Sequence, residues 1–186
     1  MGEILNKIKE RRSIREYEEK QISDDSLNNI LEAATFAPSG QNKQNWIFTA
    51  IQNKEILSKL NLAIKNRFSD SIVPELKEKG KSTNFSFNYN APTFIIVSAP
   101  RESLLGTYDA GAALQNIFLA AHEEGLGSVW IHALTRLYDY TDIREILTEV
   151  GIPETHVITG SAAIGYIKGD IPSLKPRKEG TISIYR

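Results

Sequence analysis

The sequence contains no cysteine in its 186 residues. This absence excludes disulfides, thiolate nucleophiles, cysteine-ligated zinc and iron–sulfur clusters. The chain also lacks an excess of charge of either sign, because 22 Lys and Arg stand against 23 Asp and Glu for a formal net charge of -1. Binding to nucleic acid or to an anionic membrane normally needs a basic surface. We therefore expect no nucleic acid and no membrane as partner.

Long apolar runs and several common motifs are absent as well. No window is long enough to span a bilayer, and residues 1–10 interrupt their apolar side chains with charge instead of forming the apolar core of a signal peptide. We therefore expect a cytoplasmic protein. Gly125 and Gly127 do not begin a dinucleotide-binding fingerprint, because Trp130 stands at the third glycine position. The three histidines lack the spacing of metal ligands, so no metal site is predicted.

Helical and extended patterns alternate along the chain, which predicts a single α+β domain over residues 1–186 with a mixed sheet around a buried helix. Residues 110–121 carry no charge, so their helix is expected to be buried nearly all round. Residues 67–92 include Pro74 and Gly80 and are expected to be irregular, as functional lids often are. The other expected helices cover residues 4–8, 24–37, 54–66 and 142–150, and the expected strands cover 46–51, 93–99, 128–132 and 155–167.

Two segments carry most of the binding chemistry. Arg11-Arg12-Ser13-Ile14-Arg15 supplies guanidinium forks, which match phosphate oxygens, and residues 37–46 (APSGQNKQNW) supply a hydroxyl, several amides and an aromatic ring. Together they suit a phosphorylated, planar, polar cofactor. The alternatives are structural: a basic helix end that complements the macrodipole, and a turn that ends a helix.

Four blocks, in this order, resemble the nitroreductase family of FMN-dependent NAD(P)H oxidoreductases, and the resemblance runs over almost the whole chain. The blocks are residues 11–15, residues 37–46, residues 109–131, and Gly165-Tyr166 followed by residues 175–178 (KPRK). The resemblance implies a nitroreductase-like α+β fold, with a central, mixed but mainly antiparallel sheet flanked by helices. It also implies an intertwined homodimer with FMN sites at the subunit interface.

The resemblance further implies roles for particular residues. The arginine block and the KPRK block meet around the FMN phosphate, Arg15 lies near the N1 and O2 edge of the flavin, and the loop after Pro38 reaches the flavin of the other subunit. Residues 131–133 pass over the ring, where His132 departs from the Gly or Glu that is frequent in the family. The expected cofactor-binding residues are Arg11, Arg12, Ser13, Arg15, Pro38, Ser39, Gly40, Asn42, Gln44, Ile131, His132, Ala133, Lys175 and Arg177.

The implied reaction is a ping-pong transfer of hydride from NADH or NADPH to flavin N5 and then to a nitroaromatic, a quinone or a similar small-molecule acceptor. No catalytic side chain is expected, because the flavin carries the chemistry and Arg15 tunes it. Phe85, Phe87 and Tyr89 are expected to line or cover the substrate side. Two alternatives remain open: a flavin-dependent dehalogenase or flavin-destructase relative, and an FMN-binding redox sensor without turnover.

Overall fold

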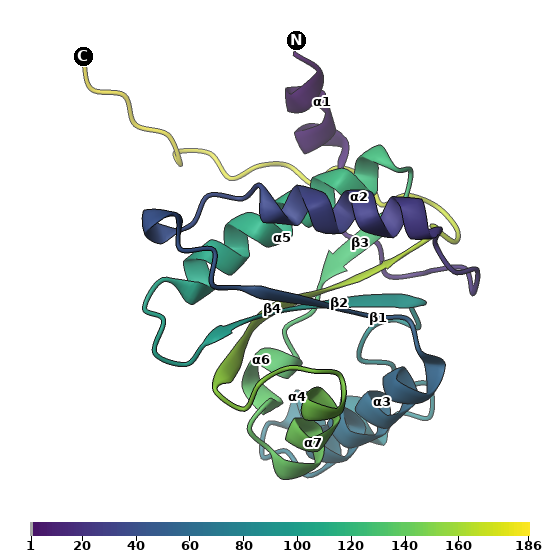
Figure 1. The fold of residues 1–186 in the computed structure, drawn as a ribbon. Coiled ribbons are helices and arrows are strands. Elements are labelled where there is room, and N and C mark those ends of the chain that lie inside the picture. Colours follow the sequence, from purple (N-terminus) through teal and green to yellow (C-terminus); the bar gives the residue numbers. More distant parts are fainter. Residues whose placement is uncertain (1) are drawn as a thin grey trace.

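The computed structural model describes residues 2–186 and has three layers (Figure 1). A four-stranded sheet lies in the middle, two helices cover one face, and four helices cover the other. The helices are α1 (Glu3–Glu10), α2 (Asp24–Thr35), the 3-10 turn η1 (Gly40–Asn42), α3 (Lys54–Ser69), α4 (Pro74–Lys81), α5 (Gly106–Glu123), α6 (Leu134–Leu137) and α7 (Thr141–Glu149). The strands are β1 (Ile47–Ile51), β2 (Thr93–Pro100), β3 (Gly127–Trp130) and β4 (His156–Gly165).

The strand order is β1-β2-β4-β3, and all three pairs are antiparallel. A register shift between Val97 and Ser98 marks a bulge in the central pair of strands. The expected α+β fold with a mainly antiparallel sheet is therefore confirmed. The parallel contribution is limited, within residues 2–186, to one isolated bridge between Ser13 and Ser128.

The central strand β2 joins two hydrophobic clusters, one on each face of the sheet. Ile95 and Val97 point into the cluster formed with α2 and α5, whereas Phe94 and Ile96 point into the opposite cluster. This division follows from the two-residue period of a strand. Seven of the eight residues of β2 are buried, so this strand is covered on both faces.

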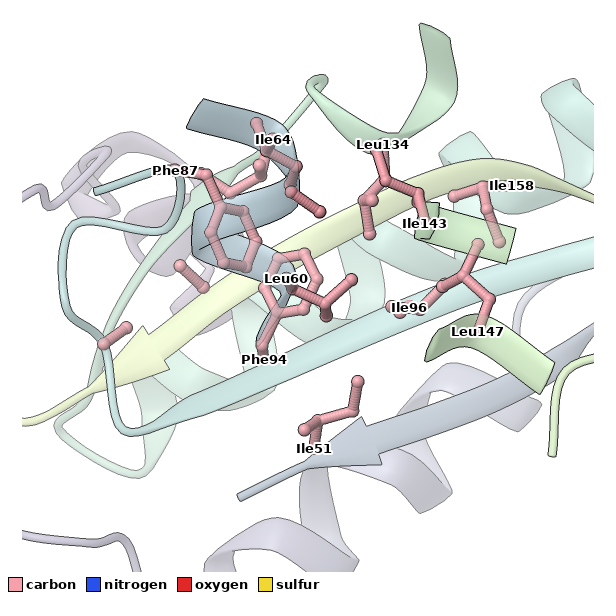
Figure 2. Close-up of a cluster of buried hydrophobic side chains, with 14 of the residues drawn as sticks. Ile51, Leu60, Ile64, Phe87, Phe94, Ile96, Leu134, Ile143, Leu147 and Ile158 are labelled. Carbon is pink, nitrogen blue, oxygen red and sulfur yellow. The ribbon is translucent and has the colours of Figure 1, made fainter. Parts of the chain in front are cut away.

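The cluster that contains Phe94 and Ile96 fills the space between the sheet and helices α3, α6 and α7 (Figure 2). Phe94 and Ile96 of the sheet meet Leu60 of α3 and Leu147 of α7, and all four side chains are fully buried. Burying one such side chain stabilises the fold by about 1.5–3 kcal/mol. This core fixes α3, α6 and α7, and so it positions the loop that follows β3.

The expectation of an irregular segment at 67–92 is wrong in its first half. Helix α3 continues to Ser69, and residues Pro74–Lys81 form the additional helix α4. Pro74 occupies the first turn, where its fixed φ and missing N–H favour a helix instead of breaking it. Gly80 allows α4 to pack directly on the end of α3, because a Cβ there would collide with the backbone of Ser69.

Helix α5 is buried on one side only, which corrects the expectation that it is buried nearly all round. Leu114 and Ile117 are fully buried against the sheet and α2, but Tyr108 is 75% exposed and Gln115 is exposed on the opposite side. The first helix, α1, has no buried residue and stands above the body of the molecule (Figure 1). The chain therefore leaves apolar helix surface without a partner.

No helix within residues 2–186 is long and apolar enough to cross a membrane. The cytoplasmic location stays a prediction.

Candidate functional site

The arginine block is held along the edge strand β3. Ile14 donates its N–H to the carbonyl of Ser128 (3.0 Å), and its side chain is buried. Gly127 is required beside it, because a Cβ there would lie 2.8 Å from the Cβ of Ile14. Tyr17 anchors the end of the segment, since its hydroxyl donates to the carbonyl of Ile14 (2.7 Å). With Ile14 pointing inward, the neighbouring Ser13 and Arg15 are directed away from the core.

Three guanidinium groups gather where this segment begins. Burial lowers the pKa of Arg11, and the nearby positive charges of Arg12 and Arg177 lower that pKa further. The Arg11 guanidinium also lies 5.6 Å from the ring centroid of Phe118. Within the described chain no carboxylate forms an ion pair with any of the three arginines. The cluster is therefore an unsatisfied concentration of positive charge.

Arg12 differs from Arg11 in how it is bound. Its Nη1 donates to the carbonyls of Lys9 (2.6 Å), Glu10 (2.9 Å) and Arg11 (3.0 Å), so it caps the end of α1. Its Nε is buried and has no hydrogen-bond partner. Such an orphaned donor, next to two further cations, fits a phosphate-bearing ligand, because buried polar groups are normally hydrogen-bonded.

Arg15 points to a cavity on the other side of the segment. Its guanidinium lies 5.9 Å from the ring centroid of Tyr89. Both side chains line a cavity of about 530 Å³, together with Ala133 and Lys168. The sequence did not indicate Lys168 as a site residue, because it lies in no motif. Its N–H donates to the carbonyl of Glu16 (3.1 Å), and this hydrogen bond brings Lys168 beside Arg15.

Tyr89 is held in an unusual backbone conformation at this cavity. Tyr89 and Asn90 both have a φ of 57°, in the left-handed region that bulky residues rarely adopt. The turn is fixed by the hydroxyl of Ser86, which accepts from the Asn90 N–H (2.7 Å), and by the amide of Asn88, which donates to the Ala91 carbonyl (3.0 Å). Such strain costs on the order of 1–3 kcal/mol and is typical of ligand sites.

Residues 131–133 lie between this cavity and a larger one. Ile131 is buried, and its N–H donates to the carbonyl of Ser161 (2.9 Å). The side chain of His132 is exposed and stacks on Trp130, with ring centroids 5.2 Å apart and ring planes at 8°. Both rings line the larger cavity of about 890 Å³, and Ala133 lines both cavities. The Nε1 of Trp130 is a second buried donor without a partner.

The loop after Pro38 lies at the other end of the molecule, beside the first turn of α5 (Figure 1). The N–H of Gly40 donates to Asp109 (3.0 Å), and a Cβ on Gly40 would collide with Leu105. At a rise of about 1.5 Å per residue, Asp109 is about 14 Å along the helix from Phe118, which contacts Arg11. One chain therefore does not bring this loop to the arginine cluster.

The same loop presents strained polar residues. Gln41, Asn42 and Gln44 have positive φ values of 57°, 55° and 48°. Gln44 donates its side-chain amide to Asn42 (2.9 Å), and the Ser39 hydroxyl accepts from the Gln44 N–H (3.1 Å). The buried carboxylate of Asp109, to which the sequence assigned no catalytic role, has a positioning role here because it holds Gly40.

The segment 168–186 is exposed throughout and projects from the body of the molecule (Figure 1). It includes Lys175 and Arg177, and Arg177 is close enough to lower the pKa of Arg11. Arg67, a further cation in this part of the molecule, forms an ion pair with Asp142 (2.7 Å). The aromatic residues Phe85, Phe87 and Tyr89 line the cavity beside Arg15, and the expectation that they face the substrate stays a prediction.

The geometry defines a two-part site: a cationic cluster suited to phosphate, and an adjoining cavity with aromatic walls and an arginine at its edge. The chain belongs to the nitroreductase family, whose profile matches residues 8–166.

Particular relatives agree with this assignment. The chain is 41% identical to a nitroreductase from Bacteroides fragilis whose crystal structure contains bound FMN, with a TM-score of 0.96 and complete coverage of both chains. It is 35% identical over 178 residues to an Archaeoglobus fulgidus protein named as an NADH dehydrogenase/NAD(P)H nitroreductase, covering 91% of this chain and 88% of that one. It is also 25% identical to an iodotyrosine deiodinase from Thermotoga neapolitana, with 96% of each chain covered.

Proposed function

We propose that this protein is a homodimeric, FMN-dependent oxidoreductase that uses NADH or NADPH to reduce nitroaromatics, quinones or similar acceptors. The observation that carries the proposal is the group of Arg11, Arg12 and Arg177, which repel one another and have no anionic partner in the described chain. A phosphate monoester carries about two negative charges at neutral pH and would relieve this repulsion. The FMN bound in the Bacteroides fragilis relative has such a group.

The remaining residues of the site fit the other parts of FMN. Ser13 follows the arginines and could donate to the phosphate or the ribityl chain, as could Lys175 from the exposed tail. Arg15 would place a fixed positive charge at the edge of the flavin, where it favours negative charge that develops on the ring. Ala133 and the backbone near it would lie against the ring, since this residue lines both cavities.

FMN, when bound, supplies the redox chemistry by accepting hydride from the nicotinamide and passing it to the acceptor. The chain then needs to bind, to orient and to exclude water, and no side chain needs to act as nucleophile. The cavities beside Arg15 share residues, so donor and acceptor would occupy the same space. This shared space favours a ping-pong order, in which the oxidised nicotinamide leaves before the acceptor binds.

The position of the loop at Pro38, Ser39, Gly40 and Asn42 supports the homodimer in this proposal. The loop cannot reach the arginine cluster of its own chain, so a partner subunit would bring it to the flavin. The stripe of α5 formed by the exposed Tyr108 and Gln115 and the half-buried Ala112 and Leu119 would pack in that interface, because these residues share one helix face. The apolar side of α1 would be covered in the same way, since Ile4, for example, is 75% exposed in the single chain.

The test is anaerobic stopped-flow mixing of FMN-loaded protein with NADH and, separately, NADPH. We expect the protein to bind on the order of one FMN per chain. The visible absorbance of the bound flavin should bleach with at least one donor and should return on mixing with a nitroarene or a quinone. A protein that stays colourless after incubation with FMN would refute the proposal. Bound FMN that no donor reduces would favour the redox sensor instead.

A dehalogenase is the second candidate, and the similarity to an iodotyrosine deiodinase is the observation that favours it. An iodophenol acceptor added to the same reduced enzyme separates the two activities. Iodide release at a rate comparable to nitroarene reduction would establish the second candidate, whereas reoxidation by nitroarenes alone would exclude it.

A further inference from the structure

The two cavities next to the flavin-facing residues adjoin each other. They share Phe68, Lys79, Phe87, Tyr89 and Ala133 among their lining residues. The shared aromatic rings form the walls, and Ala133 lies at the end nearest the proposed flavin. A planar aromatic acceptor would fit between these walls, since ligand cavities are mostly apolar with a few placed polar groups.

The charge around this space is strongly biased. The positive side chains that line it outnumber the negative ones, although the whole chain has a net charge of -1. The positive residues are Arg15, Arg67, Lys79, Arg136 and Lys168, and the negative residues are Glu16 and Asp70. The excess is therefore a property of this cavity and not of the surface as a whole.

Only some of these cations are free to bind a ligand. Arg67 donates to Asp142 through two nitrogens (2.7 and 3.2 Å), and this bond raises the pKa of Arg67. Arg15 is assigned to the flavin edge by the proposed function. Lys79 and Arg136 have no side-chain hydrogen bond or ion pair anywhere in residues 2–186. Both line the larger cavity, and Lys79 lines the smaller one as well.

The backbone of both residues is well anchored. Lys79 precedes Gly80, whose contact with Ser69 docks α4 onto the end of α3. Arg136 lies in α6, where the side chain of Leu134 is fully buried and the Thr135 hydroxyl donates to the carbonyl of His132 (2.8 Å). Because the backbone at Lys79 and Arg136 is fixed, less entropy is lost when their side chains bind an anion.

We propose that the preferred acceptor is an aromatic compound that carries a carboxylate or a similar anionic group, and that Lys79 and Arg136 bind this group. The proposal rests on the proposed function and specifies its substrate class. The aromatic part lies between Phe87, Tyr89 and the flavin, while the anionic group points to the rim formed by α4 and α6. For a nitro acceptor the first step is ArNO₂ + NAD(P)H + H⁺ → ArNO + H₂O + NAD(P)⁺, in which the nitro group gains the two electrons that the nicotinamide loses.

The experiment compares 4-nitrobenzoate with 4-nitrobenzyl alcohol, which have similar size but different charge. We expect wild-type kcat/KM to be about 10-fold higher for the benzoate at low ionic strength, because partly exposed charge-assisted contacts contribute modestly. Added salt should reduce this preference, since it screens exposed charges. Lys79→Gln and Arg136→Gln should each reduce the ratio of the two kcat/KM values by about 3-fold, since the two contacts together account for the preference of about 10-fold. Lys77→Gln, on the exposed side of α4 and outside both cavities, is the matched control.

A binding measurement without turnover makes the test independent of the reaction. Isothermal titration of the oxidised protein with benzoate and with benzyl alcohol should show the same preference, and the same loss in the Lys79 and Arg136 variants. Equal affinities in the wild type, or an equal loss for both compounds in the variants, would overturn the proposal. A higher KM for NADPH in the variants, with an unchanged acceptor ratio, would also overturn it and assign these cations to the donor. Failure of the proposed function is distinct, since it shows as absence of bound FMN or of its reduction.

Discussion

Replacing Arg11 and Arg12 one at a time should separate ligand binding from structure within one dipeptide. Arg11 makes no ion pair in the described chain, and its pKa is lowered first by burial and then by Arg12 and Arg177. Its positive charge therefore destabilises the protein without ligand. Arg12, in contrast, donates to three backbone carbonyls at the end of α1. Truncation of Arg11 should therefore affect mainly ligand binding, and truncation of Arg12 mainly the stability of the protein without ligand.

The magnitudes follow from these contacts. Arg11→Ala should weaken FMN binding by the value of one charge-assisted contact, about 1.5–3 kcal/mol, which is about a 10- to 150-fold increase in Kd. Without FMN the same variant loses a cation–π contact with Phe118 of about 0.5–1 kcal/mol. Relief of the repulsion from Arg12 and Arg177 offsets this loss, so the free energy of unfolding should change by less than about 0.5 kcal/mol.

Arg12→Ala should instead destabilise the protein without ligand. Loss of the cap at α1 costs about 1–2 kcal/mol, which corresponds to a decrease in Tm of about 2–8 °C for a chain of this size. The assay is thermal unfolding of each variant with and without FMN, combined with the Kd from quenching of FMN fluorescence. An Arg11→Ala variant with the Tm loss of Arg12→Ala and an unchanged Kd would refute the reasoning, because Arg11 would then be structural.

Three further predictions concern the rest of the molecule. Arg15→Ala should slow flavin reduction in stopped flow more than it raises the Kd for FMN, and Arg177→Ala should do the reverse; equal effects would contradict their separate roles. Removal of the exposed residues 170–186 should leave the circular dichroism of the protein unchanged but raise the Kd for FMN by at least about 100-fold, since Lys175 and Arg177, the two cations of this segment that are assigned to FMN, are lost. Burial lowers the pKa of His156, so below about pH 6.5 the unfolded chain takes up a proton that the folded chain does not. The free energy of unfolding, measured with urea, should therefore decrease as the pH is lowered below about 6.5, by up to about 1.4 kcal/mol per pH unit. His156→Gln should remove this part of the pH dependence; an identical slope in the variant would contradict the assignment to His156.

The strand pattern could be predicted from the sequence because it depends on local order. Residues 94–97 are continuously apolar, and a strand with that composition needs a cover on both faces. The cap of α2 also depends on local order: the Ser23 hydroxyl accepts from the Ser26 N–H (3.1 Å), and a serine before an apolar helix pattern favours such a cap. Helix α4 was missed because Pro74 and Gly80 usually end a helix, and only the packing of Gly80 on Ser69 shows why they do not.

The candidate site could be predicted only where residues close in sequence act together. The block from Arg11 to Arg15 is contiguous, so its composition alone indicates phosphate chemistry. Lys79, Arg136 and Lys168 lie in no motif, and their proximity depends on how α4, α6 and the segment after β4 pack. A sequence pattern cannot show which cations line the same cavity, nor that Arg67 already forms an ion pair with Asp142.

Helix α5 relates the two separated halves of the site to the proposed dimer. Near its start Asp109 holds the loop of Gly40, and toward its end Phe118 contacts Arg11. A two-fold interface is self-complementary, so two copies of α5 that pair antiparallel exchange their ends. The start of one helix, with its loop, then lies beside the end of the other, with its arginine cluster. Because the symmetry is two-fold, the same pairing completes a second, identical site. Ala112, which lies between Tyr108 and Gln115 on the face proposed for the interface, is small enough to permit close approach of the two helices.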